Sequence, residues 1–266
     1  MINKRKYIFF DIDGTLSIEG QGLSSIPLST IHTIQKLQEN GHIVGIASGR
    51  QLATILEYST YLDIDYIVSD GGYGVTINNN IIHIDPLEKE IAIPLCEELA
   101  NKHIPYAIML NSTDEILYAS RQMMEGREEM YFEGIPVKVI EDFDYHLYPI
   151  YKVFMKIGIG QEKIISSFDL TRINRYEEDG LVVEPDDKYK GVQEIVEYFQ
   201  GNKEDIIYFG DGYNDLNIFD QVKYSIAMGN GIEELKEKAY FVTKALWEDG
   251  IEYACKELEL IEDGDQ

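Results

Sequence analysis

Short apolar runs that end abruptly in polar or glycine-rich turns recur along the chain. They cover residues 7–10, 43–47, 66–68, 206–209 and 224–228. Runs of this kind are typical of strands that are buried on both faces of a parallel sheet. Apolar residues at helical spacing separate them, for example over residues 29–41 and 192–201. Alternating strands and helices predict an α/β domain with a doubly wound, mostly parallel sheet.

For the first of these helices, the sequence predicts Ser29 or Thr30 as the N-cap and Gly41 as the stop. The middle of the chain has a different pattern. Strand-like residues 75–77 and 81–84 flank Asn78-Asn79-Asn80, which predicts a β-hairpin, and a helix from Leu87 and further strand-like segments come next. We therefore expect an α+β module at residues 83–185, inserted into a core formed by residues 1–82 and 186–266.

Composition narrows the possible partners. The 266 residues include 48 Asp and Glu against 23 Lys and Arg, for a formal charge of −25. Such a chain repels nucleic-acid backbones and anionic membrane surfaces, so neither is expected as a main partner. The two cysteines, Cys96 and Cys255, exclude a disulfide scaffold. With no apolar stretch long enough to span a membrane, a cytoplasmic location is predicted, and monomer and weak dimer are both compatible.

Carboxylates come after the first and fourth apolar runs. Asp11 and Asp13 lie directly after residues 7–10, and Asp211 and Asp215 lie after residues 206–209. Ligands of doubly wound sheets bind at the carboxyl ends of the strands, so we expect these four side chains to converge. Gathering buried carboxylates is costly unless a cation compensates. Oxygen ligands favour a hard ion, so a Mg²⁺ site is predicted.

Two further segments carry groups that suit a phosphate. Ser48-Gly49-Arg50 comes after the second apolar run and offers a hydroxyl, backbone amides and a cation. Lys190 precedes Gly191 at the start of a predicted helix, where a cation opposes the helix dipole. Lys190 is therefore either a surface lysine or a cation directed at a phosphate and at the nucleophile carboxylate, whereas Lys188 is expected at the surface.

In this order, the segments resemble the four motifs of haloacid dehalogenase-like phosphohydrolases. The motifs are Asp11-Ile12-Asp13-Gly14-Thr15, Ser48 in Ala47-Ser48-Gly49-Arg50, Lys190-Gly191, and Gly210-Asp211 through Asn214-Asp215. The size of the insert and Glu248-Asp249-Gly250-Ile251 resemble the Cof-type branch, which carries a large α/β cap. Ser48 stands where the family often has Thr. Asp70-Gly71-Gly72 stands where it often has Asn-Gly-Ala, which puts an additional carboxylate near the site.

The resemblance implies a Mg²⁺-dependent phosphatase that acts on small phosphorylated metabolites such as sugar phosphates. Asp11 would be the nucleophile that becomes an aspartyl-phosphate, and Asp13 the general acid and base. Asp11, Asp13 (through its backbone carbonyl) and Asp211 would hold the metal, with Asp215 outside them orienting a bound water. The phosphoryl group would be held by Ser48, Gly49, Arg50, Lys190 and Asn214.

Two other functions are compatible with the same residues. A phosphomutase on the same core would produce an isomeric ester and little free phosphate. A non-catalytic regulator would bind metal and phosphometabolite, although binding alone needs no second Asp two residues after the first. The insert would set substrate preference, and its candidate contacts, chosen by charge, are Lys152, Lys156, Arg172 and Arg175.

Overall fold

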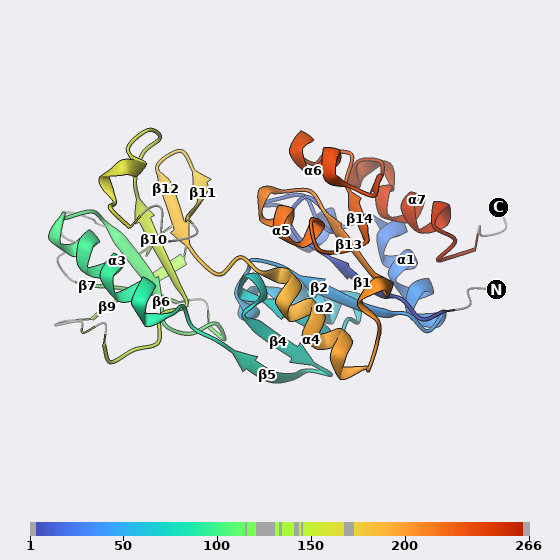
Figure 1. Cartoon of the computed structure of the whole chain (residues 1–266), viewed down its shortest axis with the longest axis horizontal. Helices are drawn as coiled ribbons and strands as arrows, with labels where there is room; N and C mark the ends of the chain where they lie inside the picture. The colour runs from blue at the N-terminus through green and yellow to red at the C-terminus, as the bar shows by residue number, and fades with distance from the viewer. Residues whose placement is uncertain are drawn as a thin grey trace. The chain divides into compact units, whose positions relative to one another are not determined.

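The computed structural model describes residues 4–114, 116–120, 131–132, 135–140, 144, 146–167 and 173–262. The chain forms two compact units (Figure 1). The first comprises Met1–Arg50, Ile55–His83 and Asp187–Gln266, and the second comprises Gln51–Thr54 and Ile84–Asp186. The long insert of the second unit thus begins and ends one residue after the predicted bounds, 83 and 185.

The first unit is built on an eight-stranded sheet in the order β15-β14-β13-β1-β2-β3-β4-β5. Neighbouring strands from β15 to β3 are parallel, and β4 is antiparallel to β3. The strands are β1 (Tyr7–Phe10), β2 (Ile43–Ala47), β3 (Tyr66–Ser69), β4 (Gly74–Ile77), β5 (Asn80–Ile84), β13 (Ile206–Gly210), β14 (Tyr224–Ala227) and β15 (Phe241–Val242). All five apolar runs singled out in the sequence form strands of this sheet.

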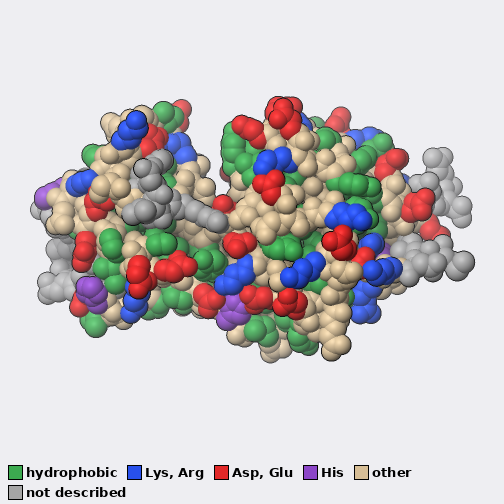
Figure 2. All heavy atoms as spheres, viewed as in Figure 1, with side chains coloured by type: hydrophobic (Ala, Val, Ile, Leu, Met, Phe, Trp, Pro, Cys, Tyr) green, Lys and Arg blue, Asp and Glu red, His purple; other side chains and the backbone are tan. Residues whose placement is uncertain are grey.

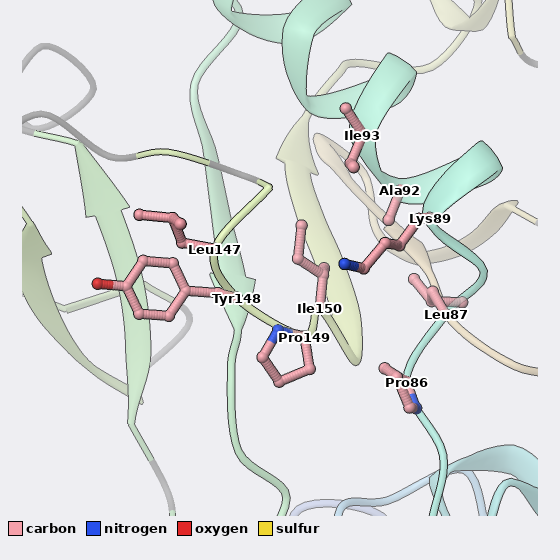
Figure 3. Close-up of a pocket in the computed structure, with 9 residues that line it drawn as sticks. All are labelled: Pro86, Leu87, Lys89, Ala92, Ile93, Leu147, Tyr148, Pro149 and Ile150. Atoms are coloured by element: carbon pink, nitrogen blue, oxygen red, sulfur yellow. The ribbon is translucent and has the colours of Figure 1, made fainter.

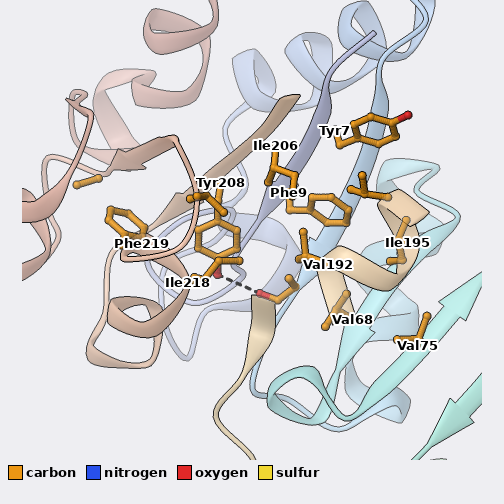
Figure 4. Close-up of a cluster of buried hydrophobic side chains, with 14 of the residues drawn as sticks. Tyr7, Phe9, Val68, Val75, Val192, Ile195, Ile206, Tyr208, Ile218 and Phe219 are labelled. Atoms are coloured by element: carbon orange, nitrogen blue, oxygen red, sulfur yellow. Dashed lines mark hydrogen bonds between the residues drawn. The ribbon is translucent and has the colours of Figure 1, made fainter. Parts of the chain in front are cut away.

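Helices join the strands of this unit. They are α1 (Leu28–Glu39), α2 (Leu52–Leu62), α4 (Lys188–Tyr198), α5 (Leu216–Phe219), α6 (Glu233–Lys238) and α7 (Gly250–Glu257). Tyr7 and Phe9 of β1 share a core cluster with Val192 of α4 (Figure 4). Ile8 and Phe10, which alternate with them, are equally inaccessible to solvent. Because successive strand residues point to opposite faces, both faces of the sheet are covered.

The starts of two helices differ from the sequence prediction. The N-cap of α1 is Pro27, which offers no side-chain cap, and Ser29 instead donates to Asp249 at 2.5 Å. Proline suits this position because the first N–H groups of a helix have no intrahelical partner. The predicted stop is confirmed, since Gly41 adopts φ +79° just after the C-cap. Helix α4 begins at Lys188, two residues before Lys190, and Asp187 is its N-cap.

The predicted hairpin is formed by β4 and β5. Asn78 and Asn79 have φ of 50° and 60°, and both lie in the left-handed region. Two consecutive residues of this kind are required by the type I′ turn, which matches the twist of the strands it joins. Asparagine tolerates that conformation better than most residues, which explains why this turn occurs at an Asn-rich segment.

The second unit has a seven-stranded sheet in the order β11-β12-β10-β6-β7-β9-β8. Its strands are β6 (Tyr106–Met109), β7 (Leu117–Ser120), β8 (Tyr131–Phe132), β9 (Ile135–Ile140), β10 (Lys152–Lys156), β11 (Ile173–Glu177) and β12 (Gly180–Val183). Helix α3 (Lys89–Asn101) contributes Leu95, Cys96 and Leu99 to the core. The unit is therefore an α+β module with its own hydrophobic core, as the sequence pattern indicates.

A pocket of about 220 Å³ opens in this second unit (Figure 3). Its walls are apolar, and they include Leu87, Ala92 and Ile150, with Leu147 at the exposed rim. Lys89, in the first turn of α3, is the one charged residue among the described residues of the lining. None of the site residues predicted from the sequence lines this pocket.

Figure 2 shows acidic side chains over the visible face of both units, with Lys and Arg side chains among them. Several are paired, as in Lys238–Asp220 at 2.6 Å. Within the described residues, no helix combines the length and the apolar character that a membrane crossing requires. The cytoplasmic location stays a prediction. Both cysteines are buried free thiols, and burial raises the pKa of Cys96 to about 12.

Candidate active site

Three carboxylates converge where β1 and β13 end. Oxygen atoms of Asp11, Asp211 and Asp215 all lie within 4.8 Å of one another. The cause is the parallel register, which places Phe10 beside Phe209, so that the residues after both strands emerge at one edge. The Asp11 amide donates to the Phe209 carbonyl at 3.0 Å and fixes this alignment. The predicted convergence is confirmed for these three residues.

A buried lysine lies among these carboxylates. The Lys188 ammonium donates to Asp11 Oδ1 at 2.8 Å and to Asp215 Oδ1 at 2.6 Å. Its side chain is only 1% exposed. The prediction that Lys188 is a surface residue is therefore wrong. Lys190, predicted from the sequence to lie at the phosphate, is exposed and lies over the Tyr73 ring at 4.6 Å.

Helical spacing explains why Lys188 is buried in the site and Lys190 is exposed. Lys188 precedes Val192 by four residues and Ile195 by seven, so the three lie on one face of α4. Both apolar residues are fully buried. Residues two apart point about 200° apart around a helix, and Lys190 therefore points away from that face. The spacing of Lys188 to the apolar residues was a usable sign in the sequence.

Burial and mutual repulsion set the ionisation of the cluster. Burial raises the pKa of Asp11 to about 7, although the neighbouring Lys188 ammonium lowers it. Burial, reinforced by the charges of Asp11 and Asp215, raises the pKa of Asp211 to about 8. For Lys188, burial alone would lower the pKa, but the two carboxylates outweigh burial and raise it. Burial thus opposes the ionisation of Asp11 and Asp211, and the Lys188 ammonium offsets only part of this effect.

Asp215 shapes the loop that carries Asp211. Its Oδ2 accepts the backbone N–H groups of Asp211 at 2.9 Å and of Gly212 at 3.0 Å. The Asp211 side chain is also held by the loop after β1, because the Thr15 hydroxyl donates to its Oδ1 at 2.8 Å. Since both oxygens of Asp215 are engaged by protein donors, its contacts suit a supporting role and leave Asp11 and Asp211 as the more available ligands.

The Asp13 side chain does not join the other three carboxylates, contrary to the prediction that all four converge. Both of its oxygens accept from Arg50, Oδ2 from Nε at 2.8 Å and Oδ1 from Nη2 at 2.6 Å. This bidentate pair is the strongest arrangement available to the two groups. Burial lowers the pKa of Arg50, but the hydrogen bond and the charge of Asp13 outweigh burial and raise it. The guanidinium also lies 5.1 Å from the ring centre of Tyr58.

The other predicted phosphate-binding residues lie at strand ends on the same sheet. Ser48 comes directly after β2 and is 2% exposed, and its hydroxyl oxygen accepts the Arg50 N–H at 3.2 Å. The hydroxyl hydrogen is thus available for another acceptor. Gly49 and Asn214 are partly buried, the latter in the turn Tyr213–Asp215 after β13. Their contacts to a phosphate stay a prediction.

The turn Asp70–Gly72 connects two parts of the site. Asp70 is fully buried with φ +51°, and its amide donates to the Arg50 carbonyl at 2.8 Å. The Gly71 amide donates to the Ser48 carbonyl at 3.2 Å, and the Gly71 carbonyl accepts the Asp187 amide at 2.7 Å. The turn therefore ties the Ser48–Arg50 loop to the residue that caps α4, immediately before Lys188.

The basic residues predicted to contact substrate from the insert already have acidic partners. Lys152 pairs with Glu184, Lys156 with Asp179 at 3.3 Å and Arg175 with Glu162 at 2.5 Å. Arg172 lies outside the described residues. Each described cation thus already has a carboxylate partner within the inserted unit.

An acidic, lysine-centred site at the carboxyl edge of a doubly wound sheet is typical of α/β enzymes that bind small ligands. The profile of haloacid dehalogenase-like hydrolases matches residues 8–254. The chain belongs to this family. This finding confirms the predicted family and, at the level of that family, the predicted class of phosphoric monoester hydrolases.

Sequence relatives and solved structures support the same assignment to this family. A protein of Bacillus subtilis (strain 168) named "Putative phosphatase YkrA" is 33% identical over 259 residues, 96% of this chain and 98% of its own length. A crystal structure of a protein from Geobacillus kaustophilus HTA426 superposes with a TM-score of 0.81 at 31% identity, covering 97% of this chain and 100% of the other. A sugar phosphatase of HAD subclass IIB superposes at 0.77 and 24% identity, covering 96% and 100%. The predicted α/β core with an inserted module is confirmed.

Proposed function

We propose that this protein is a Mg²⁺-dependent phosphatase that hydrolyses small phosphorylated metabolites through an aspartyl-phosphate on Asp11. The observation that carries the proposal is the contact of Asp11 with Lys188 beside Asp211. Asp11 Oδ1 accepts from the ammonium at 2.8 Å, whereas no described residue donates to Oδ2. One oxygen is anchored and the other is left to react, as nucleophilic catalysis by a carboxylate requires.

The donor set fits magnesium. Asp11 and Asp211 offer hard oxygen ligands within 4.8 Å of each other. Burial raises the pKa of both because it makes their ionised forms costly without a compensating cation. In our proposal they hold Mg²⁺ together with the backbone carbonyl of Asp13. The bound ion supplies positive charge that offsets the repulsion between carboxylate and phosphate.

In the first step, Asp11 Oδ2 forms a bond to phosphorus while the ester P–O bond breaks. The departing oxygen takes a proton from Asp13, which acts as general acid. In the second step, Asp13 takes a proton from water, the resulting hydroxide bonds to phosphorus, and the bond to Asp11 breaks. Inorganic phosphate and the free alcohol are the products, and Asp11 and Asp13 return to their starting states.

Arg50 has to release Asp13 before Asp13 can hold a proton, because both Asp13 oxygens accept from Arg50. A phosphate dianion offers Arg50 an alternative pair of oxygens in the same bidentate geometry. We propose that substrate binding exchanges one partner for the other. Ser48, Gly49 and Asn214 would donate to the remaining phosphoryl oxygens. Lys188 would take the place predicted for Lys190 through its positive charge beside them, because its three N–H donors already have acceptors.

The proposed substrate class takes support from names of relatives. Two Bacillus subtilis relatives, each 24% identical, are named 5-amino-6-(5-phospho-D-ribitylamino)uracil phosphatases. A Saccharolobus solfataricus relative, 25% identical, is named a phosphoglycolate phosphatase. All of these names describe small phosphate monoesters. The inserted unit would select among such esters and exclude water during the first step.

Phosphate release from p-nitrophenyl phosphate and a panel of sugar phosphates tests the proposal. Wild type with Mg²⁺ is expected to turn over, and chelator, Asp11→Asn and Asp13→Asn are each expected to reduce turnover by at least about 10²-fold. Full activity of Asp11→Asn would refute the nucleophile. Isomeric esters without free phosphate would indicate a mutase, and ligand-dependent stabilisation without turnover would indicate a regulator.

A further inference from the structure

A tyrosine lies in the core directly behind the proposed site. Tyr208 is the third residue of β13, is fully buried and belongs to the core cluster in Figure 4. Its ring meets Phe219 edge-on, with centroids 6.0 Å apart. Its hydroxyl, however, does not end among apolar atoms. It lies 2.6 Å from Asp215 Oδ1 and 3.2 Å from Lys188 Nζ.

Counting protons assigns the direction of these hydrogen bonds. An ammonium has three N–H donors, and Lys188 has three acceptors in Asp11, Asp215 and Tyr208. Tyr208 has a single O–H. Its short contact goes to the charged acceptor Asp215, whereas its approach to the Ala47 carbonyl is 3.4 Å and therefore weaker. Tyr208 thus accepts from Lys188 and donates to Asp215.

We propose that Tyr208 is a positioning residue for phosphoryl transfer, an inference that rests on the function proposed above. Its hydroxyl completes the coordination of the Lys188 ammonium and holds it against Asp11 Oδ1. The same hydroxyl holds Asp215 Oδ1, while Asp215 Oδ2 supports the amides of Asp211 and Gly212. The Tyr208 hydroxyl therefore aligns Lys188 with the nucleophile Asp11, and it also supports the loop that carries the proposed metal ligand Asp211.

Packing alone does not account for this hydroxyl. A core tyrosine usually costs free energy unless its O–H finds a partner, and phenylalanine would fill the same space. Phe9 on β1 and Phe209, next to Tyr208 on β13, are equally buried and serve the core without a hydroxyl. The short contact of the Tyr208 hydroxyl instead goes to a carboxylate of the site.

Tyr208→Phe removes the hydroxyl and keeps the ring. With p-nitrophenyl phosphate and saturating Mg²⁺, kcat per folded molecule is expected to fall about 10-fold to 100-fold, the usual cost of losing a group that orients an active-site residue. KM is expected to change less than about 3-fold, because Tyr208 does not touch substrate. The matched control is Tyr7→Phe, a buried tyrosine on the adjacent strand whose ring packs near Phe199. Unchanged kcat in Tyr208→Phe would overturn the proposal.

A second measurement does not depend on activity. In protein labelled with ¹⁵N-lysine, the thrice-bonded Lys188 ammonium is expected to give a signal that exchanges slowly with solvent and is absent from Lys188→Met. Tyr208→Phe should speed this exchange. An unaltered signal overturns the positioning role even if no phosphatase activity is found, whereas an altered signal without activity in wild type supports the contact and refutes the proposed function.

A third variant covers the case in which Tyr208→Phe does not fold. Incorporation of 3-fluorotyrosine at position 208 keeps the ring and the hydroxyl but makes the hydroxyl oxygen a poorer acceptor for the Lys188 ammonium. The kcat of this protein should fall below that of wild type. An unchanged kcat would again overturn the proposal.

Discussion

Lys188 Nζ lies 2.8 Å from Asp11 Oδ1, although 177 positions separate the two residues in the chain. Both side chains are almost completely withdrawn from solvent. An ammonium in that position stabilises a carboxylate that burial would otherwise protonate. It also brings positive charge to the point where a phosphoryl group would meet Asp11.

The two lysines near the start of α4 should differ sharply. Lys188→Met is expected to reduce kcat/KM for p-nitrophenyl phosphate by about 10²-fold or more, the range observed when one charge-stabilising donor is removed from a site. Lys190→Met removes the same charge two residues away and is expected to change kcat/KM less than about 3-fold. Circular dichroism would verify that both variants fold. Equal effects of the two substitutions would contradict the assignment of Lys188.

Arg50 should act through its fork geometry and not through its charge alone. Arg50→Lys keeps the charge but cannot form the bidentate pair that Arg50 makes with Asp13. We expect both Arg50→Lys and Arg50→Met to reduce kcat/KM by about 10-fold or more. Steady-state kinetics with inorganic phosphate as competitive inhibitor would show weaker phosphate binding in both. Wild-type kinetics for Arg50→Lys would mean that charge alone suffices.

Gly72 holds the cap of α4 close to the site. A Cβ atom at position 72 would lie 1.9 Å from the Asp187 carbonyl oxygen and 2.9 Å from the Lys188 nitrogen, at φ +107°. Gly72→Ala is expected to lower the free energy of unfolding by about 2–4 kcal/mol and to reduce kcat by displacing Lys188. Denaturant titration and kinetics measure the two effects.

Gly41→Ala is the matched control for this substitution. Gly41 has φ +79°, but nothing lies within 4 Å of its added Cβ. Gly41→Ala should lower the free energy of unfolding by about 1 kcal/mol through backbone strain alone and should leave kcat unchanged. If Gly72→Ala behaves like Gly41→Ala, then close packing against Asp187 has no part in placing Lys188.

Stability of the metal-free protein should depend on pH in a defined direction. The pKa of Asp211 is raised from 3.8 to about 8, so the folded state holds a proton that the unfolded state releases. Between these values the folded state binds more protons, and the free energy of unfolding falls as pH rises. The pKa of Asp11, raised to about 7, acts in the same direction.

Mg²⁺ should reverse this loss, because it binds the ionised carboxylates of the folded state. Chemical unfolding across this pH window, with chelator and with Mg²⁺, measures both slopes. Asp211→Asn should flatten the metal-free dependence. A free energy of unfolding that rises with pH in the chelated protein would contradict the crowding of carboxylates.

The strand pattern alone was sufficient to predict that Asp11 and Asp211 lie close together. Apolar runs at residues 7–10 and 206–209 predict parallel strands of one sheet, and the residues after parallel strands emerge at one edge of that sheet. The inserted module was also predictable, because its strand-like segments interrupt the alternation of the core. These properties depend on periodicity and order, which are local and can be read along the chain.

Side-chain partners were decided only in three dimensions. The sequence shows four carboxylates but not that Asp13 turns to Arg50 instead of joining the other three. It shows two lysines near the start of α4 but not the residue at which the helix begins. A shift of two residues in that start decides which of the two lysines is buried and which is exposed. Tyr208 reads as one apolar core residue among many, because a strand pattern reports which face a side chain takes and not which atoms its hydroxyl touches. Such contacts join residues distant in sequence, and their energies depend on the burial and charge that only the folded chain creates.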